Sequence, residues 1–142
     1  MKKWLLALVL PVIISGCSVN PVTGKNELSI VSPQQEVAIG EKNYRPSRQS
    51  QGGDYYLDQS LQTYVAGVGQ RLAAVSDRPD LPYEFVVLNN DVPNAWALPG
   101  GKIAINRGLL VLLEDEAQLA AVLGHEIVHA AARHGASQMT RG

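Results

Sequence analysis

The feature that most constrains this chain is a stretch without proline, residues 114–134, in which apolar side chains recur at intervals of three and four. This is the period of a helix with one buried face, and the stretch is long enough for several turns. A fold that contains it has to cover that face, so we expect a helix that belongs to the core. The periodic positions are Leu119, Val122, Leu123, Ile127, Ala130 and Ala131.

The middle of this predicted helix carries the motif His125-Glu126-Ile127-Val128-His129. Residues four apart in a helix project from the same face, so the two imidazoles can converge on one metal ion. Glu126 is rotated by about 100° from His125, which keeps it off the ion but near a water on that ion. Neutral imidazole suits Zn²⁺. We therefore predict that His125 and His129 bind one zinc ion and that Glu126 is the general base.

The alternative interpretation of the motif is a helix with two ordinary surface histidines. Three fixed positions in five arise by chance in roughly one chain in 300 of this length, so the pentapeptide alone does not distinguish a metal site from two surface histidines. Its surroundings favour the metal site, because imidazoles without partners are costly in a largely buried helix.

The first sixteen residues have the pattern of a signal peptide. Lys2 and Lys3 are basic, and residues 5–14 form an apolar segment that is too short to span a bilayer. Two small residues then precede Cys17, the only cysteine, and the segment resembles a bacterial lipobox. By that resemblance Cys17 is lipidated and anchors the protein to a membrane through acyl chains. An ordinary secretory signal that is cleaved nearby is the alternative.

Composition and charge narrow the classes of partner. The formal net charge is −1, and it falls to −3 when Lys2 and Lys3 are removed, so there is no basic stripe and nucleic acid is not an expected partner. A hydrophobic content of 46% with 18% charged residues is typical of a globular protein. The residues after position 16 are enough for one domain with a modest core.

The first half of the mature chain is predicted to contain a tether and two helices. Residues 17–31 carry turn signals and are expected to be a lipid-anchored tether. Ser and Pro at the start of the next segment predict a helix from Pro33 to about Asn43, followed by an exposed loop at 45–54. An amphipathic helix is expected over 57–76.

The second half is predicted to contain a small sheet. Residues 83–88, 95–98 and 102–105 have strand patterns, and Pro99-Gly100-Gly101 has the composition of a hairpin turn. A short helix capped by Asn106 should follow. The predicted fold class is α+β, with helices packed on a small antiparallel sheet and the histidine motif on a core helix.

Three segments together resemble the HtpX-like zinc metallopeptidases, a family that includes the CAAX prenyl proteases, the Oma-type proteases and periplasmic lipoprotein members. The segments are Asn20-Pro21-Val22-Thr23-Gly24, Asn94-Ala95-Trp96-Ala97-Leu98-Pro99-Gly100-Gly101, and Gly124 to His129 with Ala132-Arg133-His134. The resemblance implies a zincin-like gluzincin endopeptidase with His125 and His129 on zinc and Glu126 as catalytic base. Residues 32–142 are then expected to be the N-terminal part of a zinc metallopeptidase domain.

The resemblance also suggests where the protein acts and on what. It implies a periplasm-facing protease of the bacterial envelope that cleaves damaged or misassembled proteins, and Ser18 after Cys17 favours the outer membrane over the inner one. An exposed strand beside the metal can bind an extended substrate by backbone pairing. The residues predicted for this role are Asn94, Ala95, Trp96, Ala97, Leu98 and Gly100. A tight structural hairpin is the equally weighted alternative.

A third zinc ligand is missing from this interpretation. A catalytic zinc needs three protein ligands, and the family supplies the third as a glutamate on a later helix, which we expect to lie beyond Gly142. His134 follows His129 by five residues, so on a continuous helix it points about 140° away. Glu36 and Glu41 can approach only through a tertiary contact. We expect a piece of a longer peptidase; the alternatives are a weak or inactive lipid-anchored binding or chaperone-like module, or a metal store or sensor.

Overall fold

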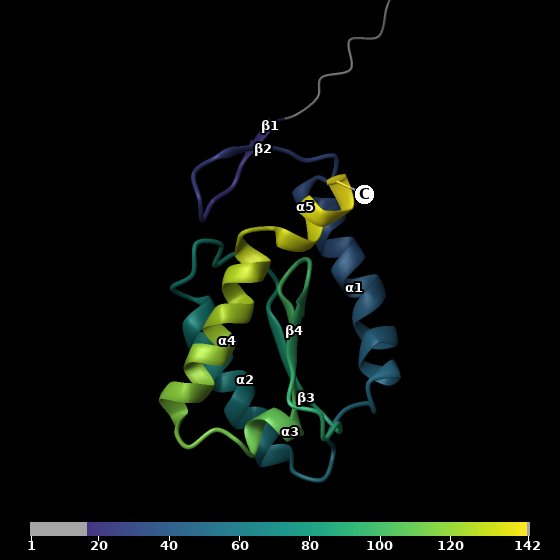
Figure 1. Cartoon of the computed structure of the whole chain (residues 1–142), viewed down its shortest axis with the longest axis vertical. Coiled ribbons are helices and arrows are strands. Elements are labelled where there is room, and N and C mark those ends of the chain that lie inside the picture. Colours follow the sequence, from purple (N-terminus) through teal and green to yellow (C-terminus); the bar gives the residue numbers. More distant parts are fainter. Residues whose placement is uncertain (1–16, 142) are drawn as a thin grey trace, which may run out of the picture.

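The computed structural model describes the backbone of residues 17–141 and has the α+β organisation predicted from the sequence (Figure 1). The predicted signal peptide at residues 1–16 lies outside the described residues. In chain order the elements are β1 (Cys17–Val19), β2 (Asn26–Leu28), α1 (Pro33–Ser50), α2 (Gln59–Ala73), β3 (Glu84–Leu88), β4 (Ala95–Leu98), β5 (Lys102–Asn106), α3 (Arg107–Leu110), α4 (Glu116–Ala131) and α5 (His134–Arg141).

The main sheet has the order β3-β5-β4, with β5 in the centre and β4 at one edge. The β4–β5 hairpin is antiparallel, as predicted, with Ala97 opposite Ile103. The prediction of a wholly antiparallel sheet is wrong, because β3 pairs in parallel with β5 and Phe85 also lies opposite Ile103. The apolar run of β3, which is buried from Phe85 to Leu88, predicts a strand but does not indicate the direction of the neighbouring strand.

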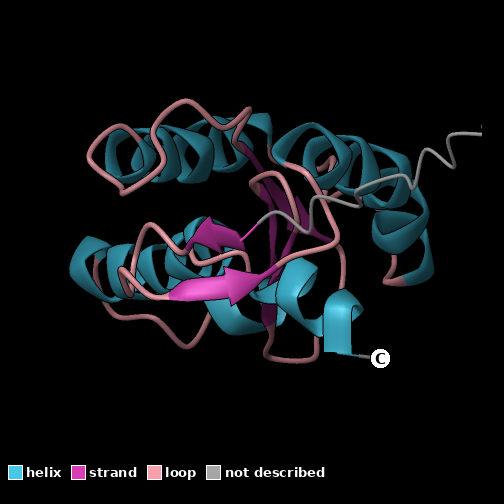
Figure 2. Cartoon of the chain, turned by 90° about the horizontal axis from the view of Figure 1, so that it is seen from above, coloured by secondary structure: helices cyan, strands magenta, loops and turns pink. Residues whose placement is uncertain are grey.

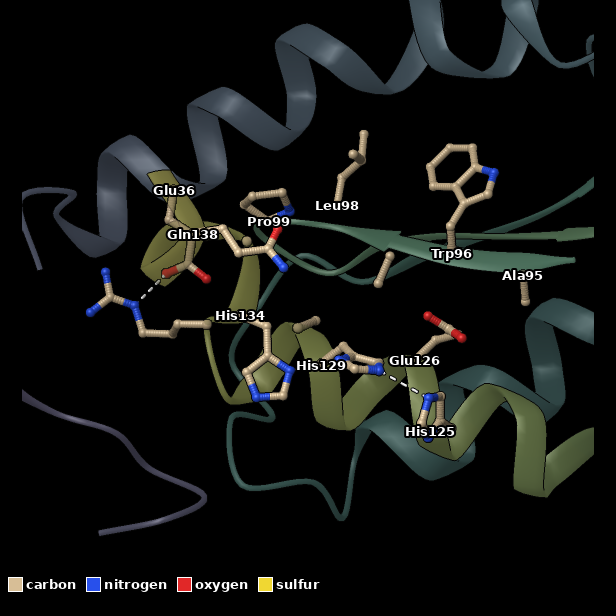
Figure 3. Close-up of a pocket in the computed structure, with 14 residues that line it drawn as sticks. Glu36, Ala95, Trp96, Leu98, Pro99, His125, Glu126, His129, His134 and Gln138 are labelled. Atoms are coloured by element: carbon tan, nitrogen blue, oxygen red, sulfur yellow. Dashed lines mark hydrogen bonds and ion pairs between the residues drawn. The ribbon is translucent and has the colours of Figure 1, made fainter. Parts of the chain in front are cut away.

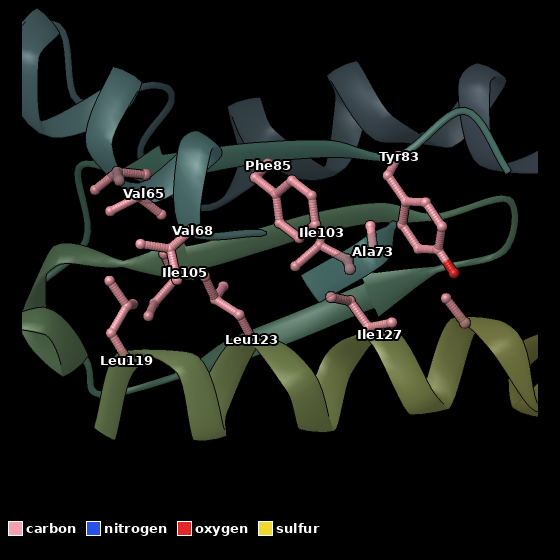
Figure 4. Close-up of a cluster of buried hydrophobic side chains, with 12 residues drawn as sticks. Val65, Val68, Ala73, Tyr83, Phe85, Ile103, Ile105, Leu119, Leu123 and Ile127 are labelled. Carbon is pink, nitrogen blue, oxygen red and sulfur yellow. The ribbon is translucent and has the colours of Figure 1, made fainter. Parts of the chain in front are cut away.

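The two faces of this sheet are covered by different helices (Figures 1 and 2). Successive side chains of a strand point to opposite faces, so the larger core gathers on the side of α2 and α4 (Figure 4). A smaller cluster lies on the side of α1. The strand residues of the larger core are Phe85, Val87, Ile103 and Ile105, and those of the smaller cluster are Val86, Leu88 and Ala104.

Helix α4 is the predicted core helix that carries the histidine motif. Asp115 caps its N-terminus, since the Asp115 carboxylate accepts a hydrogen bond from the backbone N–H of Gln118 at 2.8 Å. Leu119, Leu123 and Ile127 are spaced by four and buried against the sheet. The helix ends earlier than predicted, at Ala131, and a separate helix, α5, starts at His134.

Helix α1 is longer than the predicted helix from Pro33 to about Asn43. It begins with the predicted capping box and continues through Pro46 to Ser50, so the predicted loop at 45–54 is wrong for its first six residues. Two side chains explain the extension. The buried Tyr44 hydroxyl donates to the Ile103 carbonyl at 2.9 Å, and Arg48 Nε donates to Asp54 at 2.8 Å.

The segment predicted as a tether, residues 17–31, contains a small antiparallel sheet of β1 and β2. The turn between them is fixed by Asn20, whose Oδ1 accepts hydrogen bonds from the backbone of Val22 and Thr23. Asn20 Nδ2 donates to the Ala132 carbonyl at 2.9 Å, so this turn packs on the C-terminal end of α4, at the end of the molecule where α5 also lies (Figure 1). Within residues 17–141, no helix combines the length and apolarity needed to cross a membrane.

Candidate active site

A cleft of about 380 Å³ lies between α4 and the edge strand β4 (Figure 3). One wall is formed by α4 through His125, Glu126 and His129. The opposite wall is formed by Ala95 to Leu98 of β4 and by Pro99 of the following turn. The three motif residues that the sequence selects therefore meet the strand that the sequence selects for substrate binding, in one cavity.

The two motif histidines converge as the four-residue spacing predicts. His125 Nε2 and His129 Nε2 are 2.9 Å apart, and the ring planes cross at 85°. Two nitrogens that each lie about 2.0–2.1 Å from one zinc ion in tetrahedral geometry are separated by roughly 3.3 Å. The observed pair is thus within a few tenths of an ångström of the arrangement that two ligands of one ion adopt.

Glu126 points from α4 toward β4 and is 9% exposed (Figure 3). Burial raises the pKa of its carboxyl above the ordinary value, while the nearby imidazoles of His129 and His125 act in the opposite direction. A carboxyl whose pKa is moved toward neutrality is suited to accepting and returning a proton.

His134 lies beside His129, which the sequence argument did not anticipate. A continuous helix would point His134 away, but Arg133 has φ 59°, in the left-handed region, and α5 starts after it in a new direction (Figure 1). His134 Nδ1 lies 2.6 Å from His129 Nδ1. This is the opposite edge of the His129 ring from the nitrogen that faces His125 (Figure 3), so His134 is not a third ligand to an ion shared by that pair.

Comparison with known proteins identifies the family. The model of Peptidase family M48 matches residues 59–142, which is more than half of the chain. The chain belongs to this family. The predicted membership in a family of zinc metallopeptidases is thereby confirmed, and the α+β fold agrees with it.

Several curated relatives share this M48 region. The chain is 36% identical over 121 residues to mitochondrial metalloendopeptidase OMA1 of Schizosaccharomyces pombe, covering 84% of this chain and 36% of the relative. It is 32% identical over 131 residues to the beta-barrel assembly-enhancing protease of Escherichia coli K12, covering 92% of this chain and 26% of the relative. The chain therefore spans about a quarter to a third of the length of these relatives.

His125 and His129 are arranged as two ligands of one metal ion would be, and no third side chain joins them among residues 17–141. No group of three or more His, Cys, Asp or Glu side chains in this part of the chain is arranged to hold an ion. Glu36 does reach the cleft, as a tertiary contact, but both of its oxygens are occupied by arginines.

The Glu36 carboxylate reaches the cleft through the tertiary contact that the sequence leaves open, but its pairing with two arginines could not be predicted. It is 0% exposed and accepts from Arg78 Nη1 at 2.9 Å and from Arg133 Nε at 2.9 Å. A signal for its burial was present, because Glu36, Gly40 and Tyr44 are spaced by four on α1 and all three are buried. The arginine partners come from distant segments, and no local sequence pattern indicates that they contact Glu36.

The predicted substrate-binding residues divide into two groups. Ala95 to Leu98 line the cleft, whereas Asn94 and Gly100 do not. The Asn94 carbonyl accepts from the Asn106 backbone at 2.9 Å, which extends the hairpin. Gly100 has φ +79°, and a Cβ there would lie 2.8 Å from Val37 Cα, so glycine is needed for the turn to pack on α1.

Proposed function

We propose that this chain carries the catalytic centre of a zinc-dependent metalloendopeptidase that cleaves extended protein segments in the bacterial cell envelope. The observation that carries the proposal is the 2.9 Å approach of His125 Nε2 and His129 Nε2 beside Glu126, in a cleft walled by an edge strand. Membership in Peptidase family M48 and the relatives named as proteases support it. Residues 32–142 belong to the metallopeptidase domain.

Each motif residue has a distinct role in this proposal. His125 and His129 hold the zinc ion through Nε2. The bound ion supplies Lewis-acid polarisation of the scissile carbonyl and a lowered pKa for water. Glu126 takes the proton from the attacking water and transfers it to the leaving amine, and the pKa shift caused by its burial suits both steps.

The edge strand β4 binds the substrate in the proposal. Its one sheet neighbour is β5, so its other edge is available for backbone pairing with an extended chain. Ala95 to Leu98 and the motif residues line the same cleft, which brings a paired substrate strand next to the reacting groups. Asn94 and Gly100 hold the hairpin in place. Recognition through the backbone tolerates many side chains, as an enzyme for damaged or misassembled proteins requires.

The cellular setting is proposed from the N-terminal sequence. Lipidation at Cys17 attaches the protein to a membrane, with the outer membrane favoured and the enzyme facing the periplasm. The relative from Escherichia coli, a bacterial protease named for enhancing beta-barrel assembly, supports an envelope function.

The test of the catalytic proposal is cleavage of an unfolded protein by the zinc-loaded protein. Cleavage should stop when a chelator is added and resume when zinc is restored. Glu126→Gln should lower the rate by about 10²–10⁴-fold while zinc is still bound, because general acid–base transfer is lost and the ligands remain. His125→Ala should lose zinc as well as activity. Full activity of Glu126→Gln would overturn the assigned mechanism.

A lipid-anchored binding or chaperone-like module is the second candidate function. It is favoured by the absence of a third ligand among residues 17–141. The same variants separate it from the protease. A binding module retains unfolded protein equally well with chelator, with Glu126→Gln and with His125→Ala, and it produces no cleavage under any of these conditions.

A further inference from the structure

We propose that His134 is a positioning residue for the zinc ligand His129, through a hydrogen bond between their Nδ1 atoms. This inference rests on the proposed function, since it takes His129 to bind zinc through Nε2. Its basis is the 2.6 Å distance between the two Nδ1 atoms and the 4.8 Å separation of the ring centroids. Figure 3 shows the His134 ring next to that of His129, on the side away from His125.

The direction of this hydrogen bond follows from the chemistry of a ligand imidazole. A neutral imidazole that offers the lone pair of Nε2 to a metal carries its proton on Nδ1. His129 therefore donates from Nδ1, and His134 accepts on Nδ1 and keeps its own proton on Nε2. The bond selects the tautomer of His129 that binds metal through Nε2 and restricts rotation of its ring, as outer partners of metal-bound histidines do.

A break between α4 and α5 brings His134 to this position. A continuous helix would turn His134 about 140° away from the face of His129. The left-handed conformation of Arg133 prevents this, and such a conformation is unfavourable for a residue with a Cβ unless contacts hold it. The Arg133 side chain supplies three such contacts: it donates to Glu36 at 2.9 Å, to Ser18 Oγ at 2.9 Å and to the Val31 carbonyl at 2.6 Å.

The buried Glu36–Arg133 pair is thus connected to the metal site through the backbone. It fixes the left-handed residue Arg133, which lies just beyond the end of α4 at Ala131, and the next residue along the chain, His134, is the partner of His129. This gives the pair a role in site geometry besides its role in stability. Removing a hydrogen-bond partner of a metal ligand lowers metal affinity by about 10–100-fold in other sites, and the same range is expected for His134→Ala.

Zinc affinity of the full chain, measured by competition with a chromophoric chelator, tests the inference. His134→Ala should bind zinc about 10–100-fold more weakly than wild type. His134→Asn should restore most of the affinity, because its amide Oδ1 takes the place of the His134 Nδ1 and accepts the His129 proton. Met139→Ala is the matched control: Met139 is an exposed residue of α5 outside the cleft, and its substitution should leave zinc affinity and melting temperature unchanged.

A second readout reports the hydrogen bond itself. In the zinc-loaded protein, ¹⁵N NMR should show His129 with its proton on Nδ1 and slow exchange of that proton in wild type and His134→Asn. Exchange should become fast in His134→Ala. A zinc-ligand shift on a His134 nitrogen, or His129 carrying its proton on Nε2 and binding zinc through Nδ1, would overturn the assignment.

The outcomes separate this inference from the proposed function. If wild type binds zinc and His134→Ala binds it equally tightly, the function stands and the positioning role is wrong. If His134→Asn is as weak as His134→Ala, the effect is steric and the hydrogen-bond role is wrong. If wild type takes up no zinc at all, both proposals are overturned.

Discussion

The two faces of the main sheet are packed by different kinds of contact. On the side of α2 and α4 the fully buried cluster is aliphatic and aromatic, as Figure 4 shows for Leu119, Leu123 and Ile127 against the strands. Polar contacts on this side are only partly buried, such as those of Gln62 and Gln70 with the backbone of Val87 and Tyr83. On the side of α1 the buried set includes polar and charged groups. The Tyr44 hydroxyl bonds to the backbone of β5, Lys102 is 2% exposed and paired with Glu84, and Glu36 holds two arginines.

The difference indicates that the two faces of the sheet contribute differently to the cleft: one mainly stabilises the fold and the other mainly fixes orientation. Apolar packing has no preferred direction, so it stabilises α4 without selecting a hydrogen-bond geometry at the cleft. Hydrogen-bonded and charged groups fix orientation, because a misdirected buried charge loses its partner. These hydrogen bonds and ion pairs lie just beyond α4, at Arg133, and just after the turn that follows β4, at Lys102. They fix the positions of the two walls of the cleft relative to each other. Stability and site geometry should therefore respond differently on the two faces.

The largest effect is expected for Glu36, on the α1 side. Glu36→Ala leaves Arg133, which is 8% exposed, and the partly buried Arg78 without their carboxylate, so the free energy of unfolding should fall by about 3–5 kcal/mol. Urea denaturation followed by circular dichroism measures it. The sharper variant is Glu36→Gln, which keeps the size but removes the charge. A loss below about 1 kcal/mol for this variant would contradict the claim that the α1 side depends on charge rather than on volume.

The second effect concerns Leu123, on the α4 side, which is 0% exposed. Leu123→Ala should lower the free energy of unfolding by about 2–5 kcal/mol, because it removes buried methyl groups and leaves a cavity. Leu123→Met keeps the volume and should cost less than about 1.5 kcal/mol. Glu36→Gln also keeps the side-chain volume, but it is expected to cost substantially more than Leu123→Met because it removes a buried charge. If both isosteric variants cost the same in urea denaturation, the two faces do not differ in kind.

The same contrast explains what could be predicted from sequence. The apolar face is encoded in local periodicity, so the core helix, its motif and the β4–β5 hairpin were found from spacing and turn composition alone. The convergence of His125 and His129 follows from the geometry of one helix turn and needs no tertiary information.

The polar face depends on contacts between distant segments. For this reason the ends of α1 and α4 were predicted wrongly from the sequence. The continuation of α1 through Pro46 depends on Tyr44 bonding to β5 and on Arg48 bonding to Asp54. The end of α4 depends on Arg133 reaching Glu36, which is 97 residues away. Neither partner is visible in a local window. The position of His134 was misjudged for this reason, since only a helix break specified by remote residues brings it to His129.

The third prediction tests the close packing of α1 on the hairpin turn. A Cβ at Gly40 would lie 1.8 Å from the Pro99 carbonyl oxygen, so α1 or the turn has to move. Gly40→Ala should lower the free energy of unfolding by about 1–3 kcal/mol and should also weaken substrate cleavage, because Pro99 lines the cleft. Gly67→Ala in α2 is the matched control.

That control should change stability in the opposite direction. The nearest atom to a Cβ at Gly67 is 3.9 Å away, on the Arg71 side chain, so alanine fits and its higher helix propensity should add up to about 1 kcal/mol. Thermal and urea melts of both variants provide the comparison. Equal effects would show that helix propensity, not contact with the turn, determines the outcome at Gly40.

The smallest effect is expected at the surface, where α2 and α4 are joined by an exposed ion pair. Arg71 Nη2 lies 3.0 Å from Glu116 Oε1, and the two side chains are 65% and 52% exposed. Water and salt screen such a pair, so Arg71→Ala should lower the free energy of unfolding by at most about 1 kcal/mol, and the loss should shrink as salt is raised. Tyr64→Phe, which removes a hydrogen bond to the same carboxylate at 2.6 Å, serves as the comparison without a charge and should show little salt dependence. A loss above 2 kcal/mol at Arg71 would mean that α4 is held by a directional contact on its apolar side as well, and the contrast between the two faces would then be one of degree.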